Sequence, residues 1–76
     1  MKREIEIGKK YKHFKGHIYK VIAIAFDSEN LTKKVVYENV DDKKIWVRDY
    51  DEFNSLVDKQ KYPDVIQEYR FESVDE

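Results

Sequence analysis

The sequence predicts a mostly β fold, a small antiparallel barrel with one short helix. The chain has one long apolar run, residues 17–28, whose β-branched and aromatic side chains favour a strand. With this run it holds four or five strand-like segments, separated by turn-forming residues. Closure of such a sheet removes edges that a free sheet of this size would expose. The alternative is an open α+β sheet with the helix across one face.

Length and composition predict one domain, residues 1–76, in which 1–7 form a loose arm or a short edge strand. A chain this short buries only about 60% of the surface that its unfolded form exposes. It has no cysteine, which excludes disulfides and thiolate metal sites and favours an intracellular home. We expect no signal peptide and no membrane span, and therefore a cytoplasmic protein.

The periodicity places each element along the chain. Strands are predicted over 10–14, 17–28, 34–40, 44–48 and 68–74, and a helix of about two turns near 50–58. Both faces of the strand over 17–28 are apolar, so we expect this strand at the centre of the sheet with both faces buried. The predicted core contains Tyr19, Val21, Ile22, Ala23, Ile24, Val36, Ile45, Val47 and Phe53. A barrel built this way is of the SH3-like kind.

Local signals fix two further details. Asp49 with Glu52 three residues later is typical of a capping box, with Asp49 in the cap position. An even loop around residues 41–44 pairs Tyr37 with Arg48 in the following hairpin. That register gives one aliphatic face, whereas a three-residue loop would put Tyr37 on the same face as Ile45 and Val47.

The ordered motifs resemble a family of short bacterial proteins classed as a domain of unknown function. They are His-Phe-Lys-Gly at 13–16, Ser-Glu at 28–29, Val-Val-Tyr at 35–37 and Trp-Val-Arg at 46–48. The resemblance covers about residues 8–57 and implies a small β-rich domain without implying a reaction. The chain departs from the family pattern at Asp27, where His is usual, and at Asp49, where Pro is usual. The segment after Phe53 is also longer than usual.

Two of these motifs are candidate ligand-binding elements at strand ends. In the turn over 13–16, glycine allows close backbone approach, Lys15 supplies charge and His13 a switchable donor. The simpler interpretation is a β-turn that needs a residue with positive φ. Ser28 and Glu29 form a candidate recognition pair, or a loop in which Ser28 caps the backbone and Glu29 pairs with Arg48.

The hairpin supplies the third candidate, an aromatic patch with one guanidinium. Tyr37, Trp46 and Arg48 share a face and could stack a planar ligand or seat a partner's side chain. Alternatively, Trp46 belongs to the core and Arg48 extends along the surface. Our hypothesis is that Glu29 approaches Arg48, that Tyr37 and Trp46 flank them, and that Lys15 or His13 borders the patch.

These residues favour a non-catalytic binding module for an unknown protein or small-molecule ligand. The alternative is an enzyme, or an accessory subunit of one, acting on a small polar substrate through His13, Ser28, Glu29, Tyr37 and Arg48. The net charge of −1 gives no reason to expect nucleic acid or an anionic membrane as partner. Two histidines without recognisable ligand spacing predict no metal site, and no cofactor is expected.

Overall fold

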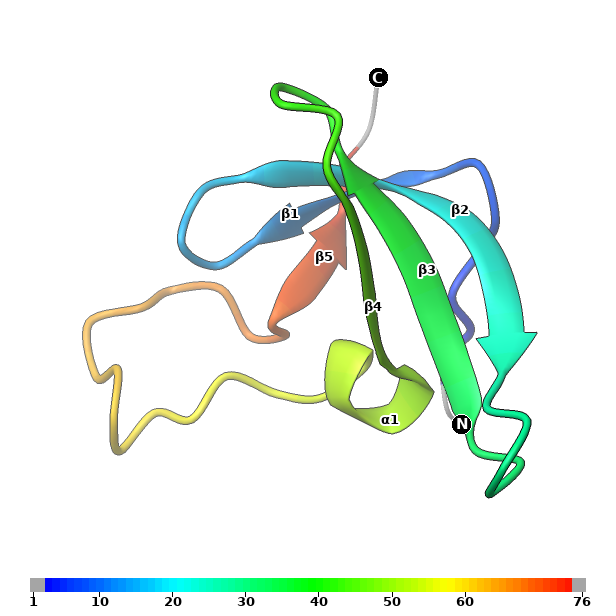
Figure 1. Ribbon diagram of the computed structural model, residues 1–76. Coiled ribbons are helices and arrows are strands. Elements are labelled where there is room, and N and C mark those ends of the chain that lie inside the picture. The colour runs from blue at the N-terminus through cyan, green and yellow to red at the C-terminus, as the bar shows by residue number, and fades with distance from the viewer. Residues whose placement is uncertain (1–2, 75–76) are drawn as a thin grey trace.

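The computed structural model describes residues 3–74, which form five strands and one short helix (Figure 1). The elements are β1 (Lys10–His13), β2 (Ile18–Phe26), β3 (Lys33–Asn39), β4 (Ile45–Asp49), α1 (Tyr50–Phe53) and β5 (Phe71–Ser73). The prediction of a mostly β fold with one short helix is confirmed. Every predicted strand is present, and β5 is shorter than the predicted span 68–74.

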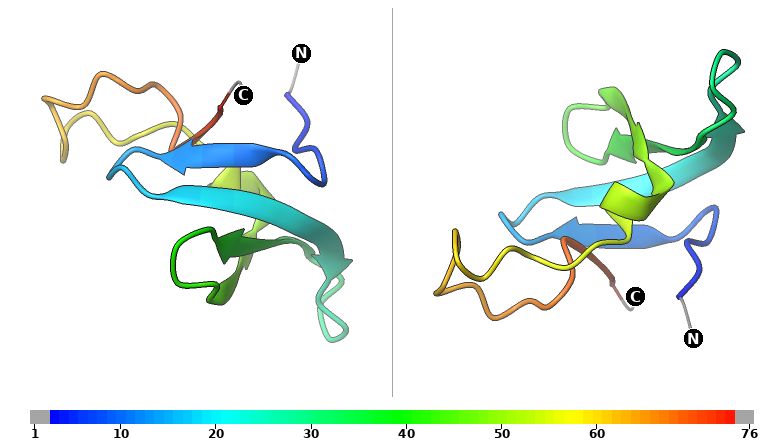
Figure 2. Two further views of the ribbon diagram at one scale, coloured as in Figure 1. Left: turned by 90° about the horizontal axis from the view of Figure 1, so that it is seen from above. Right: turned by 90° about the horizontal axis from the view of Figure 1, so that it is seen from below.

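All five strands lie in one antiparallel sheet with the order β4-β3-β2-β1-β5. β2 is the central strand, as predicted. The two edge strands, β4 and β5, do not pair with each other in the described part of the chain, so the sheet stays open and the barrel does not close. Figure 2 shows the sheet curving around α1, which lies on its concave side.

A β-bulge in β2 changes which residues face the core. Val21 lies opposite Tyr37 and Ala23 lies opposite Val36, so Ile22 is the extra residue between them. A bulge shifts the alternation by one residue. Val21 therefore faces the core on one side of the bulge, and Ile24 packs against the core on the other.

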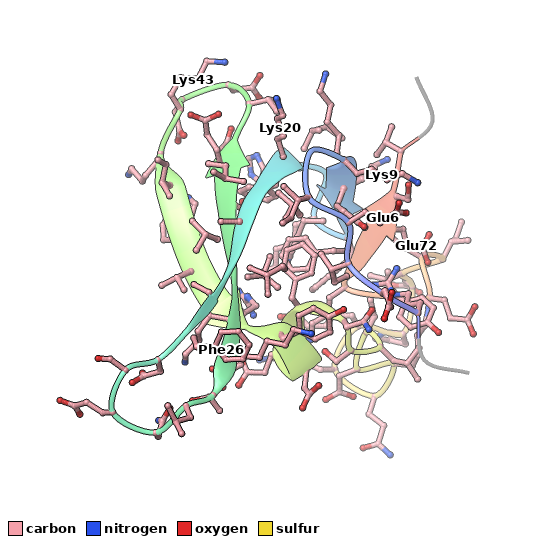
Figure 3. All side chains as sticks on the ribbon, turned by 90° about the vertical axis from the view of Figure 1, so that its right-hand side faces the viewer. Glu6, Lys9, Lys20, Phe26, Lys43 and Glu72 are labelled. Carbon is pink, nitrogen blue, oxygen red and sulfur yellow. The ribbon has the colours of Figure 1, made fainter. Side chains whose placement is uncertain are left out.

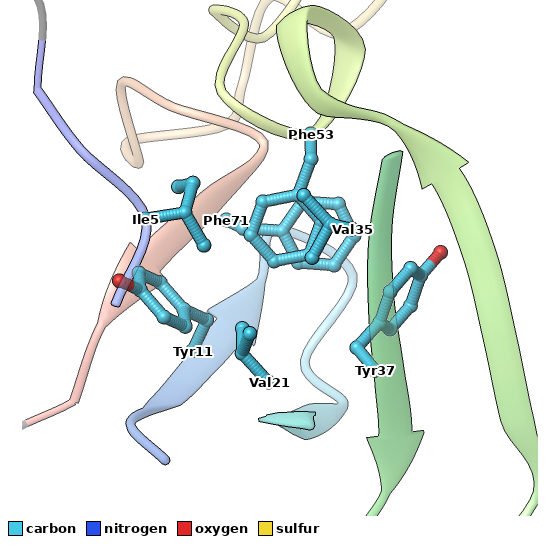
Figure 4. Close-up of a cluster of buried hydrophobic side chains, with 7 residues drawn as sticks. All are labelled: Ile5, Tyr11, Val21, Val35, Tyr37, Phe53 and Phe71. Carbon is cyan, nitrogen blue, oxygen red and sulfur yellow. The ribbon is translucent and has the colours of Figure 1, made fainter. Parts of the chain in front are cut away.

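The core lies between the concave face of the sheet and α1, and it is largely aromatic (Figure 4). Phe53 of α1 stacks on Phe71 of β5 with ring centroids 4.0 Å apart and planes 6° apart. Tyr37 meets both rings edge-on, at 5.2 and 5.5 Å. The buried cluster consists of Ile5, Tyr11, Val21, Val35, Tyr37, Phe53 and Phe71, with Val57 buried nearby.

The prediction that both faces of the central strand are buried is wrong, and so is the placement of Ile22, Ile45 and Val47 in the core. Ile22 is 40% exposed, Ile45 60% and Val47 63%, while Val36 and Ala23 are only partly buried. These side chains lie on the convex face, which no element covers in the described part of the chain. The concave face is buried instead because it carries the large aromatic rings, which remove more apolar surface from water than the aliphatic side chains do.

The hairpin between β3 and β4 has the predicted alternation in a shifted register. Tyr37 pairs with Trp46 and Val36 with Val47, so Tyr37 does not pair with Arg48 as predicted. The connecting loop is residues 40–43, an even length, which keeps Tyr37, Trp46 and Arg48 on one face. The register moves by two residues because the Asn39 carboxamide accepts hydrogen bonds from residues 41 and 42 and starts the turn early.

The helix is shorter than predicted and lacks the capping box. α1 is a single turn, Tyr50–Phe53, and the Asp49 side chain makes no cap hydrogen bond. The Asp49 carboxylate instead pairs with the Lys34 ammonium across the sheet. Without a cap or a longer apolar stripe, the helix is limited to one turn, which Phe53 anchors in the core.

The segment before β1 packs against the fold, although residues 1–7 were expected to form a loose arm or edge strand. Ile5 is buried, and its N–H donates to the Tyr50 hydroxyl at 2.9 Å. The Arg3 guanidinium lies 3.9 Å from the centroid of the Tyr69 ring. Residues 1 and 2 of that predicted arm lie outside the described residues. No helix within residues 3–74 is long and apolar enough to cross a membrane.

Candidate functional site

A cleft of about 260 Å³ opens between the β1–β2 turn and the long segment that joins α1 to β5. Figure 1 shows these two segments at the left of the molecule. Both walls come from parts of the chain far apart in sequence. The lining residues are His13, Phe14, Lys15, Arg48, Asp58, Lys61, Tyr62 and Arg70. Most of them are basic or aromatic.

The first wall is the turn over residues 13–16, which the backbone holds tightly. The His13 N–H donates to the His17 carbonyl at 2.8 Å, and the Gly16 N–H donates to the His13 carbonyl at 2.8 Å. Gly16 has φ +108°, a conformation in which side chains are strained, so this turn does need its glycine. The Phe14 N–H reaches the Arg70 carbonyl at 3.0 Å and connects this wall to the chain entering β5.

The second wall is the segment 54–70, which has little regular structure and is held by specific polar contacts. The Val57 N–H donates to the Glu68 carbonyl at 2.8 Å, which closes the segment into a loop. The Gln67 side chain donates to the Lys12 carbonyl at 2.8 Å and fastens the loop to β1. The Asp58 carboxylate accepts the N–H groups of Gln60 at 3.0 Å and Lys61 at 3.3 Å. This carboxylate therefore shapes the bend that presents Lys61 and the following tyrosine.

Arg48 enters the cleft from β4. Its Nε donates to the Tyr37 hydroxyl at 3.3 Å, and its guanidinium carbon lies 5.7 Å from the centroid of the Phe71 ring. Tyr37 is only 4% exposed, so it contributes a fixed hydroxyl from the core and no open surface. No acceptor among the described residues takes the terminal nitrogens of Arg48.

The surroundings of His13 disfavour protonation of its ring. Partial burial, together with the nearby charges of Arg48 and Lys15, and with smaller effects from His17 and Arg70, lowers the pKa of His13 to about 4. Its Nδ1 accepts the N–H of Lys15 at 3.1 Å, which requires that nitrogen to be unprotonated. At neutral pH the His13 ring is therefore neutral, and the cleft's positive charge comes from the lysines and arginines.

The four cations of the cleft are not neutralised by ion pairs. Lys15, Arg48, Lys61 and Arg70 line it against the single carboxylate of Asp58. Within residues 3–74, the ion pairs that the structure shows join Lys9 to Glu6 and Lys34 to Asp49, and none includes a cleft residue. The Lys15 ammonium lies near aromatic rings instead, 5.8 Å from that of Tyr62 and 6.0 Å from that of Phe14. The lysines and arginines that line the cleft therefore outnumber its carboxylates by four to one.

The structure brings together three of the residues that the sequence singled out. His13, Lys15 and Arg48 line one cleft, and the hydroxyl of the buried Tyr37 accepts a hydrogen bond from Arg48. Trp46 shares the face of Arg48 and is 46% exposed, but it lies outside the cleft beside the Lys44 ammonium, 5.6 Å from its ring.

The Ser28–Glu29 pair lies elsewhere. Both residues are exposed in the loop after β2, at the opposite end of that strand from His13 (Figures 1 and 3). The loop is held by the Asp27 carboxylate, which accepts the Glu29 N–H at 2.9 Å. In the described part of the chain, no ion pair joins Glu29 to Arg48.

Sequence reasoning missed five lining residues, Phe14, Asp58, Lys61, Tyr62 and Arg70. Phe14 lies at the end of the first predicted strand and Asp58 at the end of the predicted helix. Lys61 and Tyr62 fall between that helix and the last predicted strand, which contains Arg70. The available signal was the mixture of lysines, a tyrosine and the only proline over 59–64, which is unusual for a purely solvated loop.

Among residues 3–74, no three His, Asp or Glu side chains gather as metal ligands.

Fold and site together define a small open-sheet β protein with a basic, aromatic-walled cleft at one end. A family described as a protein of unknown function (DUF1653) matches residues 9–73, and the chain belongs to that family. The match confirms membership in a domain-of-unknown-function family, and it extends beyond residues 8–57 into the second wall of the cleft. No curated protein and no solved structure matches the chain.

Proposed function

We propose that this protein is a non-catalytic binding module whose cleft holds an anionic group. The observation that carries the proposal is the convergence of four cations without ion-pair partners on one cleft. Like charges that line one cleft repel one another. Binding an anion there relieves the repulsion and satisfies the terminal nitrogens of Arg48.

The geometry favours a binding module over an enzyme built on the residues proposed from sequence. Such an enzyme would need His13, Ser28 and Glu29 around one substrate, since a serine nucleophile requires an adjacent base. His13 and Ser28 lie at opposite ends of β2. Arg48 and Arg70, by contrast, have the planar, multi-donor groups that suit carboxylate or phosphate oxygens.

A titration with inorganic phosphate and sulfate, at constant ionic strength and followed by amide NMR, tests this function. We expect saturable shifts confined to residues 13–16, 48, 58–62 and 70. Arg48→Gln should weaken binding by at least about tenfold, because hydrogen bonds to charged groups contribute roughly 1.5–3 kcal/mol. Lys20→Gln is the matched control, since this exposed lysine of β2 does not line the cleft (Figure 3). Shifts that are non-saturable, or equally large in Arg48→Gln, would refute the proposal.

A further inference from the structure

We infer that the ligand of the cleft is a phosphate monoester carrying a planar ring, the class to which mononucleotides belong. This inference rests on the proposed function, because it names the kind of anion that the cleft binds. Three features carry it: the number of cations, the two guanidinium groups on different elements, and the aromatic side chains of the same cleft.

The charge balance favours a phosphoryl group over a carboxylate. A carboxylate brings one negative charge and two oxygens, whereas a phosphate monoester brings about −1.5 to −2 charges and three acceptor oxygens at neutral pH. The cleft has four cations against one carboxylate, and the Asp58 carboxylate already accepts two backbone N–H groups. A single carboxylate ligand would leave most of this charge uncompensated.

The two arginines approach from different elements. Arg48 is on β4, and Arg70 immediately precedes β5, where its N–H donates to the Ser55 carbonyl at 2.9 Å and its carbonyl accepts from Phe14 at 3.0 Å. Both residues are half-buried, and the Arg48 guanidinium is also oriented by the Tyr37 hydroxyl. Planar guanidinium groups that come from two elements suit the several oxygens of one phosphoryl group.

The rings of Phe14 and Tyr62 form an aromatic wall in the cleft, which binding of a bare anion would not require. The Phe14 ring stacks on His13 at 4.4 Å, and the Tyr62 ring is tilted against Phe14 at 4.9 Å. Tyr62 is half-buried on the cleft, with the ammonium groups of Lys15 and Lys61 5.8 and 5.6 Å from its ring centroid. A planar heterocycle attached to the phosphate can stack on this wall, and stacking on protein aromatics stabilises such complexes.

The charge distribution favours a small ligand over a nucleic-acid chain. The net charge of the protein is −1, although four cations gather at the cleft. A polymer backbone needs a basic track that neutralises successive phosphates. The rest of the chain is net negative, so one compact basic cleft neutralises one phosphate group and offers no track for successive phosphates.

The test compares four probes by calorimetry at pH 7.5 and constant ionic strength: AMP, inorganic phosphate, acetate and adenosine. We expect AMP to bind about tenfold more tightly than inorganic phosphate, from one stacked base. Acetate should bind far more weakly than phosphate, and adenosine alone should give no measurable heat. If AMP binds no more tightly than phosphate, or acetate binds as well as phosphate, the ligand class is wrong while anion binding stands. If none of the anions binds, the proposed function itself is refuted.

Substitutions separate the two parts of the ligand. Tyr62→Leu should weaken AMP binding about tenfold more than it weakens phosphate binding, because only AMP has a ring to stack. Tyr62→Phe keeps the ring and should retain the preference for AMP. Arg70→Gln should weaken both probes, and Lys20→Gln neither. Equal losses of AMP and phosphate binding in Tyr62→Leu would refute the role of the aromatic wall, provided that circular dichroism shows the variant folded.

Discussion

The β-bulge in β2 makes two neighbouring residues energetically very different, and a pair of alanine substitutions measures the difference. Val21 is fully buried in the core beside Tyr37, whereas Ile22 is the extra residue of the bulge and is 40% exposed. Simple alternation and side-chain size would rank Ile22 as the costlier residue to truncate. The structure reverses that order.

The magnitudes follow from burial. Val21→Ala removes two buried methyl groups, a loss of about 1.5 kcal/mol of transfer free energy, and the cavity left behind raises the cost to roughly 2–3 kcal/mol. Ile22→Ala removes more atoms, but they lie on the open convex face and leave no enclosed cavity, so we expect a loss below about 1 kcal/mol. A fully buried isoleucine would cost roughly 2–5 kcal/mol.

Urea unfolding followed by aromatic fluorescence gives both free energies, with the m-value as a check that the unfolding transition is unchanged. In a domain this small, a loss of 2–3 kcal/mol should lower the melting temperature of Val21→Ala by roughly 10–20 °C. The Ile22→Ala variant should melt within a few degrees of the natural protein. If Ile22→Ala costs as much as Val21→Ala, then the bulge is misplaced and the convex face is covered.

Three further predictions concern other parts of the molecule. The pKa of His13 lies near 4, below its ordinary 6.5, so the unfolded chain binds more protons between those values. The contribution of His13 to the free energy of unfolding should therefore be fully present above about pH 6.5. It should be lost as the pH falls to about 4, and solvent screening limits this loss to about 2 kcal/mol. Urea unfolding between pH 5 and 7 should show this dependence flattened in His13→Gln and retained in His17→Gln, and an identical slope in both would contradict it. Gly16→Ala should cost about 1–2 kcal/mol through its φ of +108° alone, because an added Cβ would meet no atom within 4 Å; a neutral effect on thermal melting would argue against this backbone conformation. Val47→Thr should change the unfolding free energy by less than about 0.5 kcal/mol, since Val47 is 63% exposed, and a loss above 1 kcal/mol would show that this face is buried.

Much of the fold could be predicted from local sequence because its elements depend on local rules. Alternation identified the strands, Gly16 identified the turn between β1 and β2, and the even loop placed Tyr37, Trp46 and Arg48 on one face. Each of these features depends on residues a few positions apart. The short helix was also located correctly at its start, Tyr50, although its length was overestimated.

The buried face could not be predicted in the same way. Both faces of β2 are apolar, so alternation gave no preference. The bulge at Ile22 moved the inward position that follows Val21 from Ala23 to Ile24. The choice depended on Phe53 and Phe71, which stack although they are distant in sequence. These rings cover the concave face through long-range packing, which no local sequence pattern predicts.

The cleft shows the same division. The sequence by itself determined its first wall, since His13 and Lys15 flank a glycine turn whose geometry is local, and it identified Arg48 as a notable cation on the hairpin. Only the tertiary structure decided that Lys61 and Arg70 meet them. These residues belong to an irregular segment without periodicity, and its path is set by long-range hydrogen bonds such as that from Gln67 to the Lys12 carbonyl. Charge clustering across such distances in sequence depends on how the chain returns to the sheet, and that return is governed by packing rather than by local propensity.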